Sequence, residues 1–455
     1  MSLKASISGI RGIVGETLTV PVITKYVLSF CTMLGKGKIV IGRDSRISGK
    51  IISKLVKSII NCVSRDVIDL GIVPTPFLLY VVSKNSEFAG GIVITASHNP
   101  EEWNALKFVD SSGKFLNSSQ FEKLSDLYNN EKFNYATYDK LGSSYKDKKL
   151  ASSNIDNIIN FIGNDLIKKK DFSVGFDTVN GACGNWVEKF LKKIGIKKIE
   201  SINIKPTGKF AHNPEPTPEN LNDLSLLVKN KKLDIGFALD PDGDRLVISD
   251  ENGNILSEEM TLAICVEYYL TYHKKSDVVI NLSTSRMVED IAKRFERKVI
   301  RAKTGEINVT ETMEAGGELI GGEGNGGIIA MEINKCRDAF VGMGFILDYM
   351  ARSNKSIYEL SKEIPKYYLI KEKIKVKESD KEFDIDICID RIKKEFENEY
   401  KNVKTDLRDG FRFDFPNGSW LLIRKSNTEP IVRIFAEAKT EIEARNLINS
   451  VLFTI

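Results

Sequence analysis

The feature that most constrains this chain is a pattern that occurs three times in the same order. Each copy opens with a short apolar segment and a small polar turn, followed by an amphipathic helical stretch. The three openings are residues 38–46, 173–181 and 278–285. A strand, a turn and a helix in this order indicate a βα unit. We interpret the pattern as a triplicated α/β unit, with coincidental recurrence of a common motif as the alternative.

The copies also agree beyond their first helix. In each copy a second strand leads into a loop, at residues 73–76, 205–208 and 303–305. A third strand then ends in the most unusual peptide of its region. These peptides are TASHNP (residues 95–100), DPDGDR (240–245) and GGEGNGG (321–327).

Length and the repeat together predict four domains, since 455 residues are too many for one hydrophobic core. A polar linker at residues 141–154 and a boundary near 251–258 separate the copies into residues 1–150, 151–255 and 256–369. The βα pattern stops after Tyr367, and residues 370–455 indicate strands, a helix near 384–397 and a final helix. We therefore expect an α/β protein: three tandem similar α/β domains with mixed sheets plus a C-terminal α+β domain.

Composition excludes several functions. The 66 Lys and Arg nearly balance the 62 Asp and Glu, and a net charge of +4 does not favour binding to nucleic acid or to a membrane. No apolar run approaches the ~18 residues of a membrane span, and the N-terminus lacks a signal-peptide core. Six cysteines without CxxC spacing indicate reduced thiols in a cytoplasmic protein, and three histidines make a histidine-built metal site improbable.

Ser97 is the first candidate reactive residue. It follows the apolar run at residues 92–94 and would lie at the carboxyl end of a strand, where open α/β sheets bind ligands. His98 comes next, and Lys107 is ten residues further on. This setting suits a nucleophilic or phosphate-carrying serine. An equally good alternative is that Ser97 caps a helix that begins near Pro100.

Asp240, Asp242 and Asp244 form a candidate metal site. Alternate side chains of an extended segment point the same way, so the three carboxylates can converge. A bound cation would remove their repulsion, and oxygen ligands favour Mg²⁺, Mn²⁺ or Ca²⁺ over zinc. An EF-hand loop is excluded because Arg245 stands where that loop needs Gly. A solvated acidic turn remains the alternative.

Together with SGIRG (residues 8–12), the serine and aspartate peptides resemble those of the α-D-phosphohexomutases, the phosphoglucomutase/phosphomannomutase family that includes phosphoglucosamine mutase. The resemblance covers residues 8–433 and implies four domains around a central cleft that holds the active site. It also implies a phosphoserine enzyme that interconverts hexose 1-phosphate and hexose 6-phosphate through a hexose 1,6-bisphosphate. The alternatives are a metal-dependent sugar-phosphate phosphatase that uses the same serine and a non-catalytic sugar-phosphate binding protein.

The same resemblance assigns roles to individual residues. It implies that Ser97, as phosphoserine, and the three aspartates bind one Mg²⁺ per chain. It further implies Arg11, His98, Lys107 and Arg245 for catalysis, Lys303, Thr304, Gly305, Glu323 and Asn325 for sugar binding, and Arg424, Ser426, Asn427, Thr428 and Arg433 for phosphate binding. Arg43, in GRDSR (residues 42–46), also matches a family motif, with a role in orienting the first βα turn as the alternative. A capping box formed by Ser426 and Glu429 is disfavoured because residues 431–435 alternate like a strand.

One departure concerns proton transfer. Gly327 stands where bacterial members often carry a histidine proposed in acid–base chemistry, so we expect Lys107 or Glu306 to take that role. The preferred sugar stays open among glucose, mannose and glucosamine phosphates. We expect a monomer or homodimer, with a hinge near residues 368–372.

Overall fold

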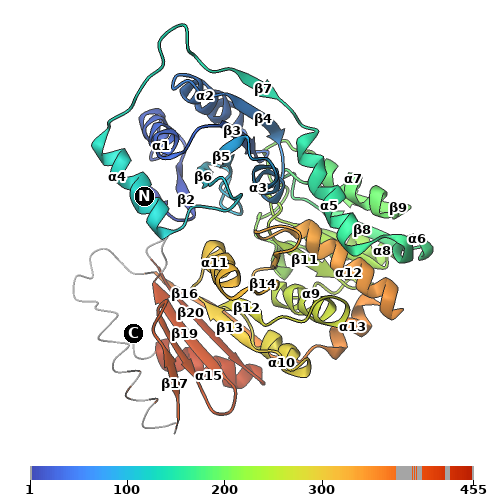
Figure 1. Cartoon of the computed structure of the whole chain (residues 1–455). Coiled ribbons are helices and arrows are strands. Elements are labelled where there is room, and N and C mark those ends of the chain that lie inside the picture. Colours follow the sequence, from blue (N-terminus) through green and yellow to red (C-terminus); the bar gives the residue numbers. More distant parts are fainter. Residues whose placement is uncertain are drawn as a thin grey trace.

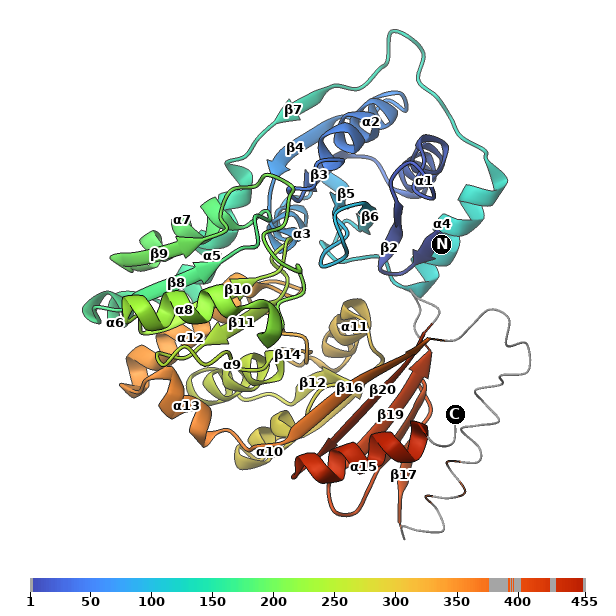
Figure 2. The ribbon, with the colours of Figure 1, turned by 180° about the vertical axis from the view of Figure 1, so that it is seen from behind.

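The computed structural model describes residues 3–375, 392, 394, 396, 402–425 and 431–452, which form four β-sheets. The chain places its units in an arc, with the first unit at one end and the last sheet at the other (Figures 1 and 2). Among these described residues, no helix has the length and apolar character needed to cross a membrane.

Three of the sheets contain the same four-strand arrangement. A central strand has a parallel neighbour on each side, and one of these neighbours pairs with an antiparallel fourth strand. The orders are β4-β3-β5-β6, β9-β8-β10-β11 and β13-β12-β14-β15. Their bounds are β3 (Lys38–Arg43), β4 (Val67–Ile72), β5 (Phe88–Ile94), β6 (Trp103–Val109), β8 (Ser173–Asp177), β9 (Lys198–Ile202), β10 (Ile235–Leu239), β11 (Leu246–Ser249), β12 (Val278–Asn281), β13 (Val299–Ala302), β14 (Ile320–Glu323) and β15 (Gly327–Ala330). Coincidental βα units would not share this order, so the predicted triplication is confirmed.

Helices connect the parallel strands, as crossover connections require. They are α2 (Gly49–Asn61) and α3 (Thr75–Lys84) in the first unit, α7 (Gly184–Ile194) and α8 (Asn222–Lys231) in the second, and α10 (Met287–Arg294) and α11 (Glu306–Gly316) in the third. The inner strands are covered on both faces, and every residue of β5, β8, β10, β12 and β14 is buried, whereas the outer strand β9 is partly exposed.

The first sheet is longer than the repeat requires. β1 (Lys4–Ser6) and β2 (Gly9–Ile13) extend it on one side, and β7 (Ser144–Lys146) pairs with β4 on the other. The predicted polar linker at residues 141–154 is partly structured, because β7 and the first residues of α5 (Ser153–Ile162) lie within it. β7 satisfies backbone groups of β4 that would otherwise form an open sheet edge. α1 (Val20–Met33) and α4 (Ser118–Asn130) complete this unit.

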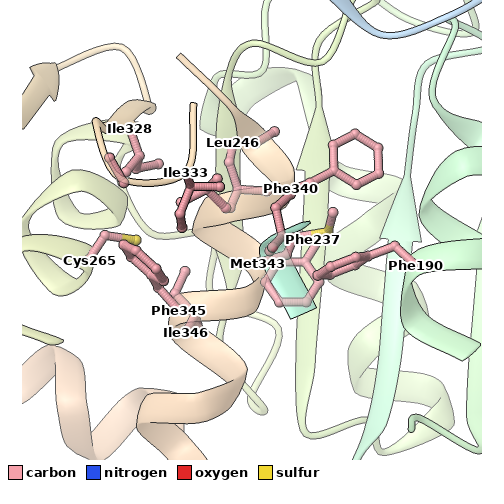
Figure 3. Close-up of a cluster of buried hydrophobic side chains, with 14 of the residues drawn as sticks. Phe190, Phe237, Leu246, Cys265, Ile328, Ile333, Phe340, Met343, Phe345 and Ile346 are labelled. Atoms are coloured by element: carbon pink, nitrogen blue, oxygen red, sulfur yellow. The ribbon is translucent and has the colours of Figure 1, made fainter. Parts of the chain in front are cut away.

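One continuous core joins the second unit to the third. α9 (Glu258–Tyr272) and α12 (Ala339–Ser353) are buried along most of their length. Figure 3 shows Phe340, Met343 and Phe345 of α12 among side chains that come from both units, including Phe190 of α7 and Ile328 of β15. Because this core is close-packed, it fixes the relative positions of β10 and β14 and of the loops that follow them. The short helices α6 (Asp165–Lys169) and α13 (Ile357–Glu363) flank it.

The last domain has a different architecture. Its antiparallel sheet has the order β16-β20-β19-β18-β17, and α15 (Glu441–Leu452) packs against it. The strands are β16 (Tyr368–Lys375), β17 (Lys404–Asp406), β18 (Phe411–Asp414), β19 (Trp420–Lys425) and β20 (Ile431–Ala438). Leu282 of the third unit packs against Trp420 and Leu422 of this sheet. The helix expected at residues 384–397 lies almost entirely outside the described residues.

Candidate active site

The three unusual peptides lie at equivalent positions of the three units. Each connects the third parallel strand to the antiparallel strand, between β5 and β6, between β10 and β11, and between β14 and β15. They meet at a central cleft of about 1470 Å³ that receives side chains from all four domains, among them Ser97, Arg245, Glu323 and Arg424. The repeat therefore directs three different loops towards one site.

Ser97 lies in this cleft with an unusual backbone. Its φ is +50°, a left-handed conformation that non-glycine residues rarely adopt and that is found preferentially at functional sites. The Ser97 hydroxyl donates to Asp240 Oδ2 at 2.8 Å, and its backbone N–H donates to Thr95 Oγ1 at 2.9 Å. Turns and then β6 follow, and no helix begins near Pro100. The helix-cap alternative is therefore wrong.

Arg46 holds the serine loop, and the sequence analysis missed it. Its buried guanidinium donates at 2.6 Å to the carbonyl oxygens of Ser97 and Asn99, and also to two further carbonyl groups of the loop. Asp44 pairs with Arg46 at 3.0 Å and accepts the Thr95 hydroxyl at 2.6 Å. The motif GRDSR that contains Arg46 was visible, but a role in binding backbone carbonyls becomes clear only from the fold.

The three aspartates converge as expected. All are fully buried, and oxygens of Asp240, Asp242 and Asp244 lie within 4.8 Å of one another. Asp240 Oδ1 accepts the backbone N–H groups of residues 243–245 at 3.0–3.2 Å, which leaves Oδ2 facing Ser97. Burial and the other two carboxylates raise the pKa of Asp240 well above its ordinary value.

Two carboxylate oxygens of this cluster accept no hydrogen bond from the described residues. Within the part of the chain that the structure describes, Asp242 Oδ1 and Asp244 Oδ1 are buried and have no hydrogen-bond partner. A buried unpaired acceptor is costly, and a cation bound by oxygen ligands would satisfy both atoms. The residues present therefore fit a divalent metal, and the solvated-turn alternative does not agree with their complete burial.

Cations surround the serine. Lys107 Nζ donates to Asp242 Oδ2 at 2.9 Å; although burial opposes the effect, this charge lowers the pKa of Asp242. Burial lowers the pKa of Arg11 to about 10, which still leaves the side chain charged near neutral pH. Arg245 lines the same cleft, and its guanidinium is 3.6 Å from the carboxylate of Glu215. The site therefore has the positive charge that a phosphate group requires.

His98 differs from these residues. Burial, together with the charges of Arg245 and Arg11, lowers its pKa well below the ordinary value of 6.5. Its Nδ1 lies 3.4 Å from the Ser97 hydroxyl. The imidazole is therefore neutral near pH 7 and adds no charge to the site.

Arg337 connects the loops of the second and third units, and no sequence motif indicated its role. Its buried guanidinium donates to Asp244, to Glu323 Oε2 at 2.6 Å and to Glu306 Oε2 at 3.0 Å. One residue thus binds a candidate metal ligand, a candidate sugar ligand and a candidate proton acceptor.

The absence of a side chain at residue 327 is explained by its close contact with Arg337. A Cβ atom added there would lie 2.1 Å from Cδ of Arg337, far closer than side-chain atoms can approach. A side chain at 327 therefore requires Arg337 to leave its present position. The departure at Gly327 was the one signal in the sequence that could have pointed to Arg337.

Glu306 is the carboxylate that best suits proton transfer. It is buried at the start of α11 and lines the cleft. Burial raises its pKa to about 7, opposed by the charge of Arg337. Groups that exchange protons near neutral pH need a pKa in this range.

The residues expected to bind sugar and phosphate are mostly at the cleft. Thr304, Gly305, Glu323, Asn325, Arg424 and Arg433 line it. Among the described residues, Asn325 Oδ1 is buried without a hydrogen-bond partner, while Glu323 Oε1 accepts from Asn281 Nδ2 at 2.7 Å. Lys303 is exposed and is not among the lining residues. Ser426, Asn427 and Thr428 lie outside the described residues.

Comparisons with known proteins match one protein family over all four domains. Family models described as phosphoglucomutase/phosphomannomutase α/β/α domains I, II and III and C-terminal domain match residues 3–135, 153–253, 257–368 and 373–452. A phosphoglucomutase/phosphomannomutase of Thermococcus kodakarensis is 36% identical over 444 residues, which cover 96% of this chain and 95% of the relative. A phosphoglucosamine/phosphogalactosamine mutase of Sulfurisphaera tokodaii is 32% identical over 451 residues, with 97% and 96% covered.

A solved structure shares the fold. The crystal structure of a phosphoglucomutase/phosphomannomutase family protein from Burkholderia thailandensis superposes with a TM-score of 0.84 at 23% identity. The superposition covers 99% of this chain and 96% of that one. The similarity therefore extends over all four domains.

Proposed function

The chain belongs to the phosphoglucomutase/phosphomannomutase family, and from this we propose that it interconverts the 1-phosphates and 6-phosphates of glucose or mannose, with glucosamine phosphate as the further candidate. The observation that carries the proposal is the Ser97 hydroxyl, 2.8 Å from an aspartate of a buried carboxylate triad, in a cleft lined by all four domains. The family and its solved structures give no support to the phosphatase alternative.

The reaction requires a phosphoryl group to move between Ser97 Oγ and a sugar hydroxyl. When the sugar is the acceptor, a bond forms between phosphorus and the sugar oxygen and the bond between phosphorus and Ser97 Oγ breaks. The sugar hydroxyl loses its proton, and Ser97 Oγ takes up a proton, so that the serine is again a free hydroxyl. A hexose 1,6-bisphosphate results, and its other phosphoryl group then returns to Ser97. Arg11, Lys107 and Arg245 stabilise the negative charge of the transferring group. Glu306 accepts the hydroxyl proton in one direction and returns it in the other.

Mg²⁺ is the metal that we propose for the aspartate triad. Ser97, once phosphorylated, and Asp240, Asp242 and Asp244 would hold it, and it would neutralise charge on the transferring phosphoryl group. Asn325 and Glu323 bind the sugar, and Arg424 and Arg433 bind the phosphate that does not react. The hinge expected near residues 368–372 lies within the paired strand β16, so the pivot moves to residues 364–367, which connect α13 to β16. Closure of the last domain about this connection excludes water that would hydrolyse the phosphoserine.

The location and assembly of the protein are also part of the proposal. The five described cysteines are free thiols, as a reducing compartment requires. We propose a cytoplasmic enzyme that acts as a monomer or homodimer on small sugar phosphates.

Turnover of purified protein with glucose, mannose and glucosamine 1-phosphates tests the function and ranks the sugars. We expect the matching 6-phosphate to form with almost no inorganic phosphate, and added hexose 1,6-bisphosphate to accelerate the reaction. Stoichiometric release of inorganic phosphate would show a phosphatase instead.

Removal of divalent cations tests the metal. We expect a chelator to abolish turnover and excess Mg²⁺ to restore it, because the two unpaired aspartate oxygens need a cation. Calorimetry should detect binding of Mn²⁺ by the wild-type chain and a loss of at least about tenfold in affinity for Asp242→Asn. Equal affinity in the variant would contradict the assignment of this ligand.

The substitution Glu306→Gln tests proton transfer. Because a base accepts a proton only when it is ionised, and the pKa of Glu306 is about 7, the wild-type kcat should rise as the pH increases through about 7. Glutamine cannot ionise, so the variant should lose roughly 10²–10⁴-fold in kcat and lose this rise with pH. Glu311→Gln on the same helix, whose carboxylate accepts from Asn117, is the matched control and should keep both. An unchanged pH profile in Glu306→Gln would assign the proton to another group, with Lys107 as the next candidate.

A further inference from the structure

A second cavity lies behind the catalytic loops. Its volume is about 750 Å³, and it shares no lining residue with the central cleft. It lies where the first and second units meet, between β3, β4 and α2 on one side and the start of α7 on the other, with residues 146–152 along its rim. Its size is within the range of about 300–1,000 Å³ that is typical of small-molecule sites.

The charge of this cavity is unusual for the chain. Among the described residues, its lining contains eight cationic side chains and a single carboxylate, a net +7, whereas the complete chain has a net charge of only +4. Six of these cations are exposed at the mouth of the cavity, and Arg43 and Lys57 are half-buried. The carboxylate, Asp69, is already paired with Lys57 at 2.6 Å. Like charges confined to one cavity repel one another, and a bound anion would remove that repulsion.

The sequence of α2 is consistent with an anion site rather than with helix stability. Lys50, Lys54 and Lys57 are spaced by four and three residues, so they share one face of the helix, where like charges are unfavourable. The helix contains no acidic residue, and Lys50 is in its first turn, where the helix dipole disfavours a cation. All three lysines line the cavity.

The opposite walls add more positive charge. Lys146, Lys148 and Lys149 also line the cavity, as does Lys189 of α7, which is 5.6 Å from the centre of the Trp186 ring. Arg43, for which the sequence analysis left the role open, completes the set at the end of β3. Lysine ammonium groups and an arginine fork are the side chains that bind phosphate groups.

The cavity is also in contact with the loops of the active site. Arg43 donates to the carbonyl oxygen of Asp44 at 2.9 Å, and Asp44 holds Thr95, which in turn accepts from the Ser97 N–H. Ala182, on another wall, donates to the carbonyl oxygen of Pro241 beside the aspartate triad at 2.8 Å. A molecule bound here would therefore contact residues adjacent to Asp44, which holds the serine loop, and to the loop of the metal-binding aspartates.

We propose that this cavity binds a small molecule that carries several phosphate groups, at a site separate from the hexose phosphate cleft. The density of positive charge, the volume and the absence of a competing carboxylate other than Asp69 in the lining select an oligophosphate over a monophosphate.

Calorimetry with inorganic tripolyphosphate as the probe tests this site. The full chain is titrated in the presence of a chelator, which removes metal binding by the probe, and with saturating glucose 1-phosphate, which occupies the cleft. We expect one tripolyphosphate to bind per chain. Binding that glucose 1-phosphate abolishes would place the anion in the cleft and overturn the proposal.

Two charge-reversal variants locate the anion. In the first, Lys50, Lys54 and Lys148 are replaced by glutamate; in the second, the same change is made at Lys123, Lys229 and Lys293, exposed lysines outside both cavities. We expect at least tenfold weaker binding in the first variant and less than a twofold change in the second. Equal weakening in both would show attraction to the whole surface, and wild-type affinity in the first would exclude the cavity; either result overturns the proposal.

Hexose phosphate turnover of the first variant separates this proposal from the mutase function. None of its three lysines lines the cleft, so turnover without tripolyphosphate should stay within twofold of wild type, which also shows that the variant is folded. Weakened binding of tripolyphosphate with normal turnover supports the second site. Normal turnover with normal binding rejects the site and leaves the mutase function unaffected.

Discussion

Replacement of Ser97 by alanine is expected to lower kcat for hexose phosphates by about 10⁴-fold or more, because the variant has no oxygen to accept and return the phosphoryl group. The chain should still fold and bind metal, since Asp240 loses only one hydrogen bond and keeps three from backbone N–H groups. Incorporation of labelled phosphate from hexose 1,6-bisphosphate should be lost in parallel.

Ser125→Ala is the matched control for this experiment. The Ser125 hydroxyl donates to the carbonyl oxygen of Phe121 within α4, away from the cleft, so its loss should leave turnover unchanged. If Ser97→Ala kept more than about a hundredth of the wild-type kcat, phosphoryl transfer would have to proceed through another residue, and the phosphoserine mechanism would be wrong.

Replacement of Arg337 by methionine is expected to have the largest effect on stability. It leaves the buried carboxylates of Asp244, Glu306 and Glu323 without their shared guanidinium. Removal of one partner from a buried ion pair typically costs about 3–5 kcal/mol, and denaturant-induced unfolding should show a loss of roughly this size. Turnover should fall as well, because the aspartate loop, the sugar ligand and the proton acceptor lose their common support.

Two further variants test the geometry of this contact. Arg337→Lys keeps the charge but not the planar fork that reaches three carboxylates, so it should recover only part of the stability. Lys192→Met removes an ion pair to Glu188 on the surface of α7, where both side chains are exposed, and should cost at most about 1 kcal/mol. Equal losses in Arg337→Met and Lys192→Met would show that the three-carboxylate contact contributes no more to stability than a surface ion pair.

The sequence alone predicted the features that depend on local patterns. The triplicated unit could be recognised because strand, turn and helix periodicities recur in order, and Ser97 and the three aspartates because their peptides are chemically unusual. The ordered strand β7 could not be predicted, since three exposed polar residues form a strand only where a neighbouring edge needs a partner.

The contributions of Arg46 and Arg337 could not be predicted for a different reason. Both bind groups that are distant in the sequence: Arg46 lies 51 residues before Ser97, and Arg337 lies 93 residues after Asp244. Contacts between residues so far apart in the sequence produce no regular spacing or periodicity from which they could be predicted. In the sequence, Arg337 is indicated only indirectly, by a glycine at 327 where bacterial relatives often carry a histidine.

The left-handed backbone at Ser97 limits which hydroxyl-bearing residue can carry the phosphoryl group at this position. Threonine offers the same oxygen to phosphorus, but its branched Cβ strongly disfavours a φ of +50°. A threonine there would turn the peptide away from the four carbonyl contacts of Arg46 and carry the hydroxyl out of line with Asp240. Serine is thus required here by the twist of the main chain as much as by its chemistry, and we expect the two alcohols not to be interchangeable.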